Sequence, residues 1–223
     1  MKISFTQNMT HEIRTPLNII SGFAQVISDP DTDISKEERT EIATRITNST
    51  NNIVNIIDEI LDISGKESIH YIDKSDLVHC NEIAQKVLRD FDDDGKDYQI
   101  RFESSLKDSY KLMTNAKEVE KILHNLLNNA CKFTEKGLIT LSCYHDEMEK
   151  DMVCFSVTDT GKGIKEGEEE KIFEHFYKVD AYKEGVGLGL PLSRRVARQM
   201  GGDVVLDTSY KDGSRFILKL PVA

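Results

Sequence analysis

The stretch "NAKEVEKILHNLLNNACKFT", residues 115–134, has two faces at helical spacing. The spacing predicts a helix whose buried face consists of Val119, Ile122, Leu123, Leu126, Leu127, Ala130 and Phe133. Asn125, Asn129 and Lys132 form a separate polar stripe at spacings of four and three. Asparagine is a mediocre helix former, so this composition costs helix propensity. Two interpretations stay open: a solvated face, or a metal and phosphate site in which amide oxygens hold magnesium and Lys132 meets a phosphate.

Strand-like and helix-like segments alternate on both sides of this stretch. Residues 81–91 and 190–200 are expected helices, and the expected strands are "SIHYI" (68–72), "YQIRFES" (98–104), "YKLMT" (110–114), "GLITLSCY" (137–144), "DMVCFSVTD" (151–159), "DVVLDTS" (203–209) and "SRFILKLP" (214–221). The fourth and fifth strands are expected to form a hairpin whose inward residues are Ile139, Leu141, Cys143, Val153, Phe155 and Val157. This alternation predicts that residues 66–223 form an α/β sandwich, with helices on one face of a mixed sheet.

The first 64 residues have a different rhythm, in which apolar residues recur at alternating spacings of four and three. The first stripe consists of Ile13, Leu17, Ile20, Ala24 and Ile27, and the second of Ile42, Ile46, Ser49, Ile53, Ile56, Ile60 and Ile63. Ser35 and Glu38 read as a capping box that opens the second helix. We expect residues 1–65 to form a helical hairpin that dimerises into a four-helix bundle, which makes the whole chain an α+β multidomain protein.

The segment "MTHEIRTPLN", residues 9–18, carries a histidine outside the first stripe. His11 lies two residues before Ile13, so its ring is expected to point outward, and Thr15 lies one turn further on the same face. Pro16 has no N–H for the carbonyl of Glu12, so we expect the helix to bend or loosen there. An idle surface histidine remains one interpretation, and a functional one is the other.

Two glycine-rich segments follow, "DTGKGI" (159–164) and "GVGLGL" (185–190). Neither has the spacing of a dinucleotide-binding or Walker loop, and ordinary turns would explain both. However, Gly185, Gly187 and Gly189 lead into a helix whose first turn contains Pro191, where free backbone N–H groups favour a polyphosphate. Asp159 ends a strand and is placed to accept a hydrogen bond from an exocyclic amine.

Composition excludes several classes of function. The 223 residues include 39 acidic and 29 basic ones, and the net charge of −10 argues against binding to nucleic acid or anionic lipid. The sequence has neither an apolar run long enough to cross a bilayer nor an apolar signal core, so we expect no membrane contact by this fragment. The four cysteines form no C-x-x-C pair, which fits reduced thiols with a packing role in a cytoplasmic protein.

Taken in order, five segments resemble the conserved boxes of sensor histidine kinase catalytic cores, over nearly the whole chain. "HEIRTPLN" resembles the phosphoacceptor box, "NLLNNACKFT" the asparagine box, "DTGKGI" and "GVGLGL" the two glycine boxes, and "IFEHFYKVD" the phenylalanine box. The resemblance implies a Bergerat ATP-binding fold for residues 66–223, and dimerisation and histidine phosphotransfer for residues 1–65.

The same resemblance implies roles for single residues. His11 is the phosphoacceptor, Glu12 orients or deprotonates it, and Thr15 is a phosphatase residue. Asn125 and Asn129 face magnesium, Lys132 faces the phosphates and Asp159 faces the adenine. The remaining residues of the ATP site are Gly161, Gly163, Lys178, Gly185, Gly187, Gly189 and Leu190. Lys178 replaces an arginine that is frequent in relatives, and Arg215 stands where serine or threonine is common.

The implied function is ATP-dependent autophosphorylation of His11, followed by phosphoryl transfer to an aspartate of a response-regulator receiver domain, separate or fused. Hydrolysing relatives carry a glutamate base where this chain has Asn125, which favours transfer over hydrolysis. A Bergerat-fold ATPase doing conformational work and a non-catalytic dimeric scaffold remain the alternatives. The chain begins within a helix, so we expect a cytoplasmic fragment of a longer protein, whose missing N-terminal part leaves room for a sensor and a membrane anchor.

Overall fold

The computed structural model describes residues 2–29, 32, 34–64, 72–91, 95–146, 148–149, 151–179 and 187–222. Within the two long N-terminal helices, the side chains of residues 2–8, 11, 12, 51, 52, 54, 55 and 58–64 lie outside this description. Contacts divide the chain into two compact units, of which one contains α1 and α2 and the other contains all strands with α3, α4 and α5. The division predicted after residue 65 remains a prediction, since residues 65–71 lie outside the described part.

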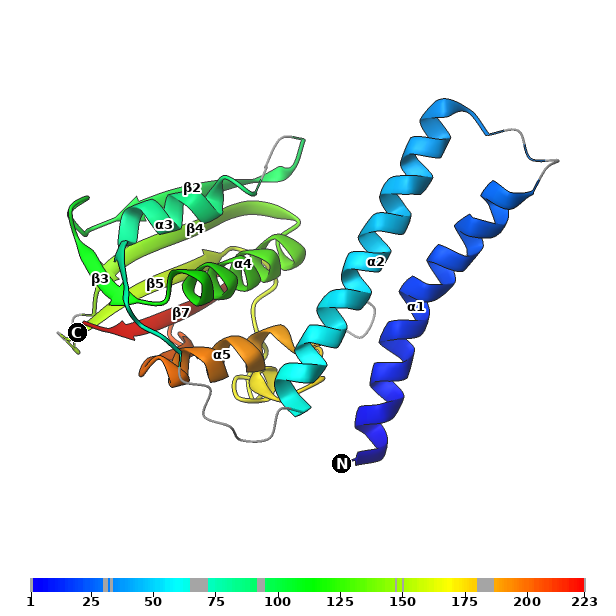
Figure 1. The fold of residues 1–223 in the computed structure, drawn as a ribbon. Coiled ribbons are helices and arrows are strands. Elements are labelled where there is room, and N and C mark those ends of the chain that lie inside the picture. The colour runs from blue at the N-terminus through cyan, green and yellow to red at the C-terminus, as the bar shows by residue number, and fades with distance from the viewer. Residues whose placement is uncertain are drawn as a thin grey trace. The chain divides into compact units, whose positions relative to one another are not determined.

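The first unit is the predicted helical hairpin (Figure 1), formed by α1 (Lys2–Ser28) and α2 (Lys36–Ser64). The capping box is confirmed: the Ser35 N–H donates to Glu38 Oε2 over 3.0 Å, and the Glu38 N–H donates to Ser35 Oγ over 3.2 Å. Pro16 is accommodated inside α1, which continues on both sides of it. The sequence therefore sets the start of α2 locally, through side-chain bonds to backbone groups that the helix leaves unpaired.

The two apolar stripes of the hairpin are buried to different extents. In the second stripe Ile42, Ser49 and Ile56 are 8%, 8% and 1% exposed. In the first stripe Leu17 and Ile27 remain 53% and 40% exposed. One hairpin thus covers much of the described part of the α2 stripe and leaves much of the α1 stripe in contact with solvent. Among the residues described, no helix combines the length and hydropathy needed to span a membrane.

The second unit is built on a five-stranded sheet of order β2-β4-β5-β7-β6. Its strands are β2 (Asp97–Ser104), β4 (Lys136–His145), β5 (Met152–Asp159), β6 (Asp203–Leu206) and β7 (Ser214–Pro221). The β2–β4 pair is parallel and the other pairs are antiparallel, so the sheet is mixed as predicted. Helices α3 (Cys80–Leu88), α4 (Ala116–Phe133) and α5 (Gly189–Gln199) lie on one face of it (Figure 1).

The core lies between this sheet and the helices. All six predicted inward residues of the β4–β5 hairpin are buried, and the buried face of α4 is the predicted one except that Phe133 is half-buried. A two-stranded sheet of β1 (Asp76–His79) and β3 (Lys111–Thr114) completes the unit. Strand β1 was not predicted, and the strand predicted at residues 68–72 lies almost entirely outside the described residues, Ile72 having no regular structure.

Candidate functional site

The polar stripe of α4 contacts α5 at Asn125. Asn125 and Asn129 are half-buried, and the Asn125 amide nitrogen donates to Ser193 Oγ over 3.0 Å. With the nitrogen so engaged, Oδ1 of Asn125 packs against Gly189, where an added Cβ would collide with the amide. Because Gly189 has no side chain, the Asn125 oxygen has space beside the start of α5. Ser193 is only 5% exposed and was not among the predicted site residues.

Asp159 ends β5 with a buried carboxylate that is 3% exposed. Its Oδ1 accepts the Gly161 N–H over 2.9 Å and the Ser214 N–H over 3.3 Å. Burial raises the pKa of Asp159, and these N–H bonds oppose the rise. The two donors fix the orientation of the carboxylate, so the strand end presents an acceptor group in a nearly dry environment.

The turn that follows Asp159 packs against the C-terminus of α4. A Cβ on Gly161 would collide with the carbonyl oxygen of Phe133 and lie 2.9 Å from Asp159 Oδ1. Gly163 has a left-handed φ of +69° and packs against Gly213, the residue before β7. Because Gly161 has no side chain, the turn after Asp159 packs directly on the end of the helix that carries Asn125 and Asn129.

Two lysines meet at the ring of Phe133. Lys132 Nζ and Lys162 Nζ lie 5.0 and 4.9 Å from the ring centroid, within the range of a cation–π interaction. Both ammonium groups are also near the carboxyl end of α4, where the helix dipole favours positive charge. Positive charge therefore gathers beside the asparagine stripe, in a position suited to an anionic ligand.

The remaining predicted ATP-site residues lie at the entry to α5 and after the short 3₁₀ helix η1 (Lys171–Phe173). Gly187 has a φ of +76°, and Gly189 and Leu190 are the first two residues of α5. Lys178 is half-buried and lies two residues after Phe176, whose φ of +67° is unusual for an aromatic residue. Gly185 lies outside the described residues.

Sequence reasoning missed Ser214 and Gly213, because their place in the site follows from the pairing of β5 with β7. The register of β5 and β7 places Ser214 directly opposite Asp159 and Arg215 opposite Thr158. Adjacent residues of a strand point to opposite faces, so Arg215 lies on the face away from the helices, where its Nε donates to Thr158 Oγ1 over 3.1 Å. The serine that partners Asp159 is therefore Ser214, and the arginine after it is no obstacle in the site.

The predicted phosphoacceptor residues belong to the hairpin unit. His11, Glu12 and Thr15 all lie on α1. Thr15 is exposed, whereas the side chains of His11 and Glu12 lie outside the described residues. The structure thus brings together the α4 stripe, Asp159 with its turn and the start of α5 in one unit, and it places the histidine on the helix of another.

Comparison with known proteins identifies both units. The model of the His Kinase A (phospho-acceptor) domain matches residues 1–69, and that of the histidine kinase-, DNA gyrase B- and HSP90-like ATPase matches residues 114–223. The aerobic respiration control sensor protein ArcB of Escherichia coli (strain K12) is 32% identical over 226 residues, which cover 98% of this chain and 28% of ArcB. The chain thus spans little more than a quarter of that relative.

Solved structures of other histidine kinases also resemble most of the chain. The histidine kinase ThkA in complex with the response regulator protein TrrA matches with a TM-score of 0.71 and 25% identity, over 99% of this chain and 61% of that one. Full-length ShkA in complex with AMPPNP matches with a TM-score of 0.67 and 26% identity, over 98% of this chain and 46% of that one. With its phospho-acceptor domain followed by an ATPase domain, the chain belongs to the sensor histidine kinases.

Proposed function

We propose that the chain is the catalytic core of a two-component kinase that uses ATP to phosphorylate His11 and passes the phosphoryl group to a receiver-domain aspartate. One observation carries the proposal. The buried carboxylate of Asp159 is fixed by two backbone N–H groups, and its turn packs on the end of the helix that carries Asn125, Asn129 and Lys132. This arrangement offers an acceptor for an adenine amine on one side and groups for a polyphosphate on the other.

The chemistry of an imidazole fits the acceptor role of His11. An imidazole with the usual pKa near 6.5 is mostly neutral at about pH 7, so one ring nitrogen already has a free lone pair. Attack by that nitrogen on the γ-phosphorus forms the N–P bond as the bond to the β-γ bridging oxygen breaks, and ADP leaves. Glu12, the next residue, would hold the other ring N–H and stabilise the imidazolium that forms.

A magnesium ion fits the donor groups of α4. Amide oxygens are hard donors of the kind that magnesium accepts while keeping water and phosphate as its other ligands. The amide nitrogen of Asn125 is bonded to Ser193, and its oxygen fits against Gly189 because that residue has no side chain, so the orientation of the amide is fixed. Asn125 and Asn129 would hold the ion, which neutralises charge on the phosphates when bound. Lys132 adds a fixed positive charge on the same helix.

The partners of the fragment follow from the same proposal. ThkA is seen in complex with a response regulator protein, and we assign a receiver domain, separate or fused, as the acceptor from His11. The exposed α1 stripe, with Leu17 and Ile27, supports a homodimer in which a second hairpin completes a four-helix bundle. Thr15 would position water for dephosphorylation of the regulator, and the fragment would act in the cytoplasm without contacting nucleic acid or membrane.

Incubation with γ-labelled ATP and magnesium tests the proposal. We expect label on the protein that survives alkali and is lost in acid, as a phosphohistidine requires, and we expect none on a His11→Gln variant. Released phosphate without labelled protein would instead indicate an ATPase doing conformational work. Failure to bind nucleotide at all would indicate a dimeric scaffold.

A further inference from the structure

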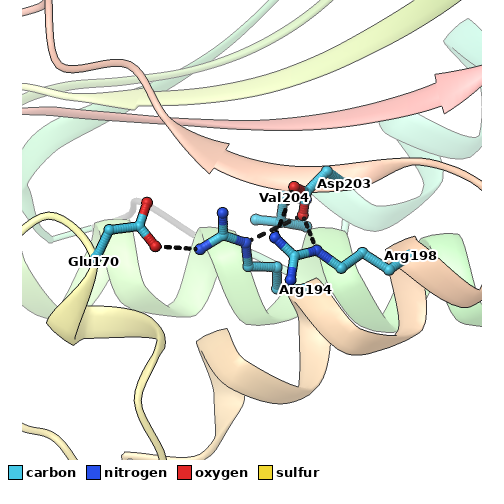
Figure 2. A network of polar contacts seen from close by, with 5 residues as sticks. All are labelled: Glu170, Arg194, Arg198, Asp203 and Val204. Atoms are coloured by element: carbon cyan, nitrogen blue, oxygen red, sulfur yellow. Dashed lines mark hydrogen bonds and ion pairs between the residues drawn. The ribbon is translucent and has the colours of Figure 1, made fainter.

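Arg194 of α5 is the centre of a polar network that joins three segments of the ATPase unit (Figure 2). Its Nη1 donates to Glu170 Oε2 over 2.9 Å, and its Nε donates to Asp203 Oδ1 over 3.2 Å. Its guanidinium also lies over the ring of Phe173, with the central carbon 4.3 Å from the centroid. The Arg194 side chain is only 16% exposed, so its contacts with Phe173 and Asp203 form in a largely desolvated environment, whereas Glu170 meets it from the solvent side.

The segment that Arg194 holds leads directly to Lys178. Ile172 is buried, and the ring of Phe173 also packs edge-on against Phe216 of β7, with a centroid distance of 6.4 Å. Further along, Phe176 has a left-handed φ of +67°, and the Tyr177 N–H donates to the Glu174 carbonyl over 3.3 Å. A strained conformation of this kind persists only where the surrounding structure fixes it. The Arg194 contacts with Glu170 and Phe173 supply such a fixed point, a few residues before the strained turn.

Arg198 provides an internal comparison, because it shares one partner of Arg194 but not the others. Its Nε and Nη2 donate to the two carboxylate oxygens of Asp203, each over 3.1 Å. Asp203 also accepts the Val204 N–H over 2.8 Å. The carboxylate at the start of β6 therefore keeps several donors when Arg194 is absent (Figure 2). Loss of Arg194 removes the contacts to Glu170 and Phe173 while leaving this end of the network in place.

We propose that Arg194 is a positioning residue for nucleotide binding, which holds residues 170–178 against α5 so that Lys178 is presented to the phosphates. The proposal rests on the proposed function, since it needs ATP as the ligand of this unit. It adds that the nucleotide affinity depends on Arg194 of α5, which acts through its contacts with Phe173 and Glu170. An arginine suits this position because its planar guanidinium stacks on the ring while separate N–H groups of the same plane donate to two carboxylates, and a compact ammonium group has no plane to stack.

The test compares Arg194→Met, Arg194→Lys and Glu170→Gln with Arg198→Met as the matched control. Three quantities are measured for each: the affinity for a fluorescent ATP analogue, the KM and maximal rate of autophosphorylation, and hydrogen exchange of the amides in residues 171–178. We expect Arg194→Met to raise Kd and KM about tenfold and to leave the rate at saturating ATP within about threefold. Exchange should rise in 171–178, and Arg194→Lys should recover only part of the loss.

The control separates positioning from a general loss of stability. Arg198→Met should lower the melting temperature without raising KM or the exchange of residues 171–178. Equal KM shifts in Arg194→Met and Arg198→Met would overturn the proposal, as would an unchanged KM in Arg194→Met. If Arg194→Met fails to fold, Glu170→Gln decides, because that side chain is 82% exposed: a KM raised about two- to threefold supports the proposal, and an unchanged KM overturns it. Absence of nucleotide binding in the unmodified chain would instead refute the proposed function.

Discussion

Replacing Asp159 by asparagine changes one oxygen acceptor of a buried carboxylate into an N–H₂ donor. The fold should tolerate the change, because an amide oxygen can still accept the Gly161 and Ser214 N–H groups that now bond to Oδ1. The NH₂ group of the new asparagine would then face the exocyclic amine of adenine. Both groups are donors, so no hydrogen bond forms between them. Hydrogen bonds to a charged group contribute about 1.5–3 kcal/mol, and a factor of ten in affinity corresponds to about 1.4 kcal/mol. We therefore expect Asp159→Asn to weaken ATP binding by about 10- to 150-fold.

Calorimetry with ATP and with purine riboside triphosphate isolates this hydrogen bond, since purine riboside has a hydrogen atom in place of the exocyclic amine. The unmodified chain should prefer ATP by the factor just given, and the Asp159→Asn variant should lose that preference while binding purine riboside triphosphate nearly as the parent does. Asp212→Asn, the same chemical change at an exposed position of the nearby turn, is the control and should alter neither affinity. Unchanged ATP affinity in Asp159→Asn, or an equal loss for both nucleotides, would refute the role of Asp159 in base recognition.

The raised pKa of Asp159 also predicts opposite responses of affinity and stability to acid. Burial raises this pKa above its ordinary value of 3.8, so the folded chain holds the proton at a pH where the unfolded chain has lost it. The contribution of this group to the free energy of unfolding therefore rises as pH falls through the folded pKa and is complete below 3.8. ATP affinity should fall over the same window, because the acceptor is protonated. Calorimetry and thermal unfolding of parent and Asp159→Asn across this range check both, and identical pH profiles would contradict the assignment.

Three further substitutions test the remaining parts of the proposal. Asn129→Asp should weaken the use of magnesium-ATP by altering ligand geometry and charge, and titration of autophosphorylation rate against magnesium at fixed ATP would show an unchanged profile if this residue faces no ion. Ile53→Asp should convert a dimer to a monomer in sedimentation, because it places a charge in an apolar stripe; a parent that is monomeric at high micromolar concentration would exclude the bundle. Thr15→Ala should slow regulator dephosphorylation while labelling of His11 stays within about threefold of the parent, and equal loss of both activities would reduce Thr15 to a support of the helix.

Periodic segments of this chain could be predicted, whereas non-local pairing could not. The α4 face and the β4–β5 inward residues follow from spacings of three, four and two within one segment, so the sequence contains them. Strand β1 has four residues with no clear alternation, and it exists through its pairing with β3, more than thirty residues away. The position of β2 beside β4 likewise depends on tertiary packing, which no local pattern records.

The same distinction applies to the candidate site. The spacing of Asn125, Asn129 and Lys132 on one helix was readable, because helical geometry alone brings them together. Ser193 and Arg194 reach their partners through the packing of α5 against α4, against β6 and against the segment around Phe173. That packing depends on how segments far apart in the chain meet. The sequence therefore predicts the polar stripe of α4 but not the side chains of α5 that contact it and the neighbouring segments.

The strict alternation of β7 has a consequence for changes in chain length. Ser214 faces Asp159 and Arg215 faces Thr158 because the strand pairs with β5 in one register. A single-residue deletion inside β7 would exchange the two faces over part of the strand, and put a guanidinium where Ser214 now lies beside the Asp159 carboxylate. A change of length in the turn between β6 and β7, at residues 207–213, would not exchange the two faces of β7. The register of β7 is held by its pairing with β5 and that of β6 by its pairing with β7. Insertions that this domain tolerates should therefore fall in that turn and stop short of Gly213.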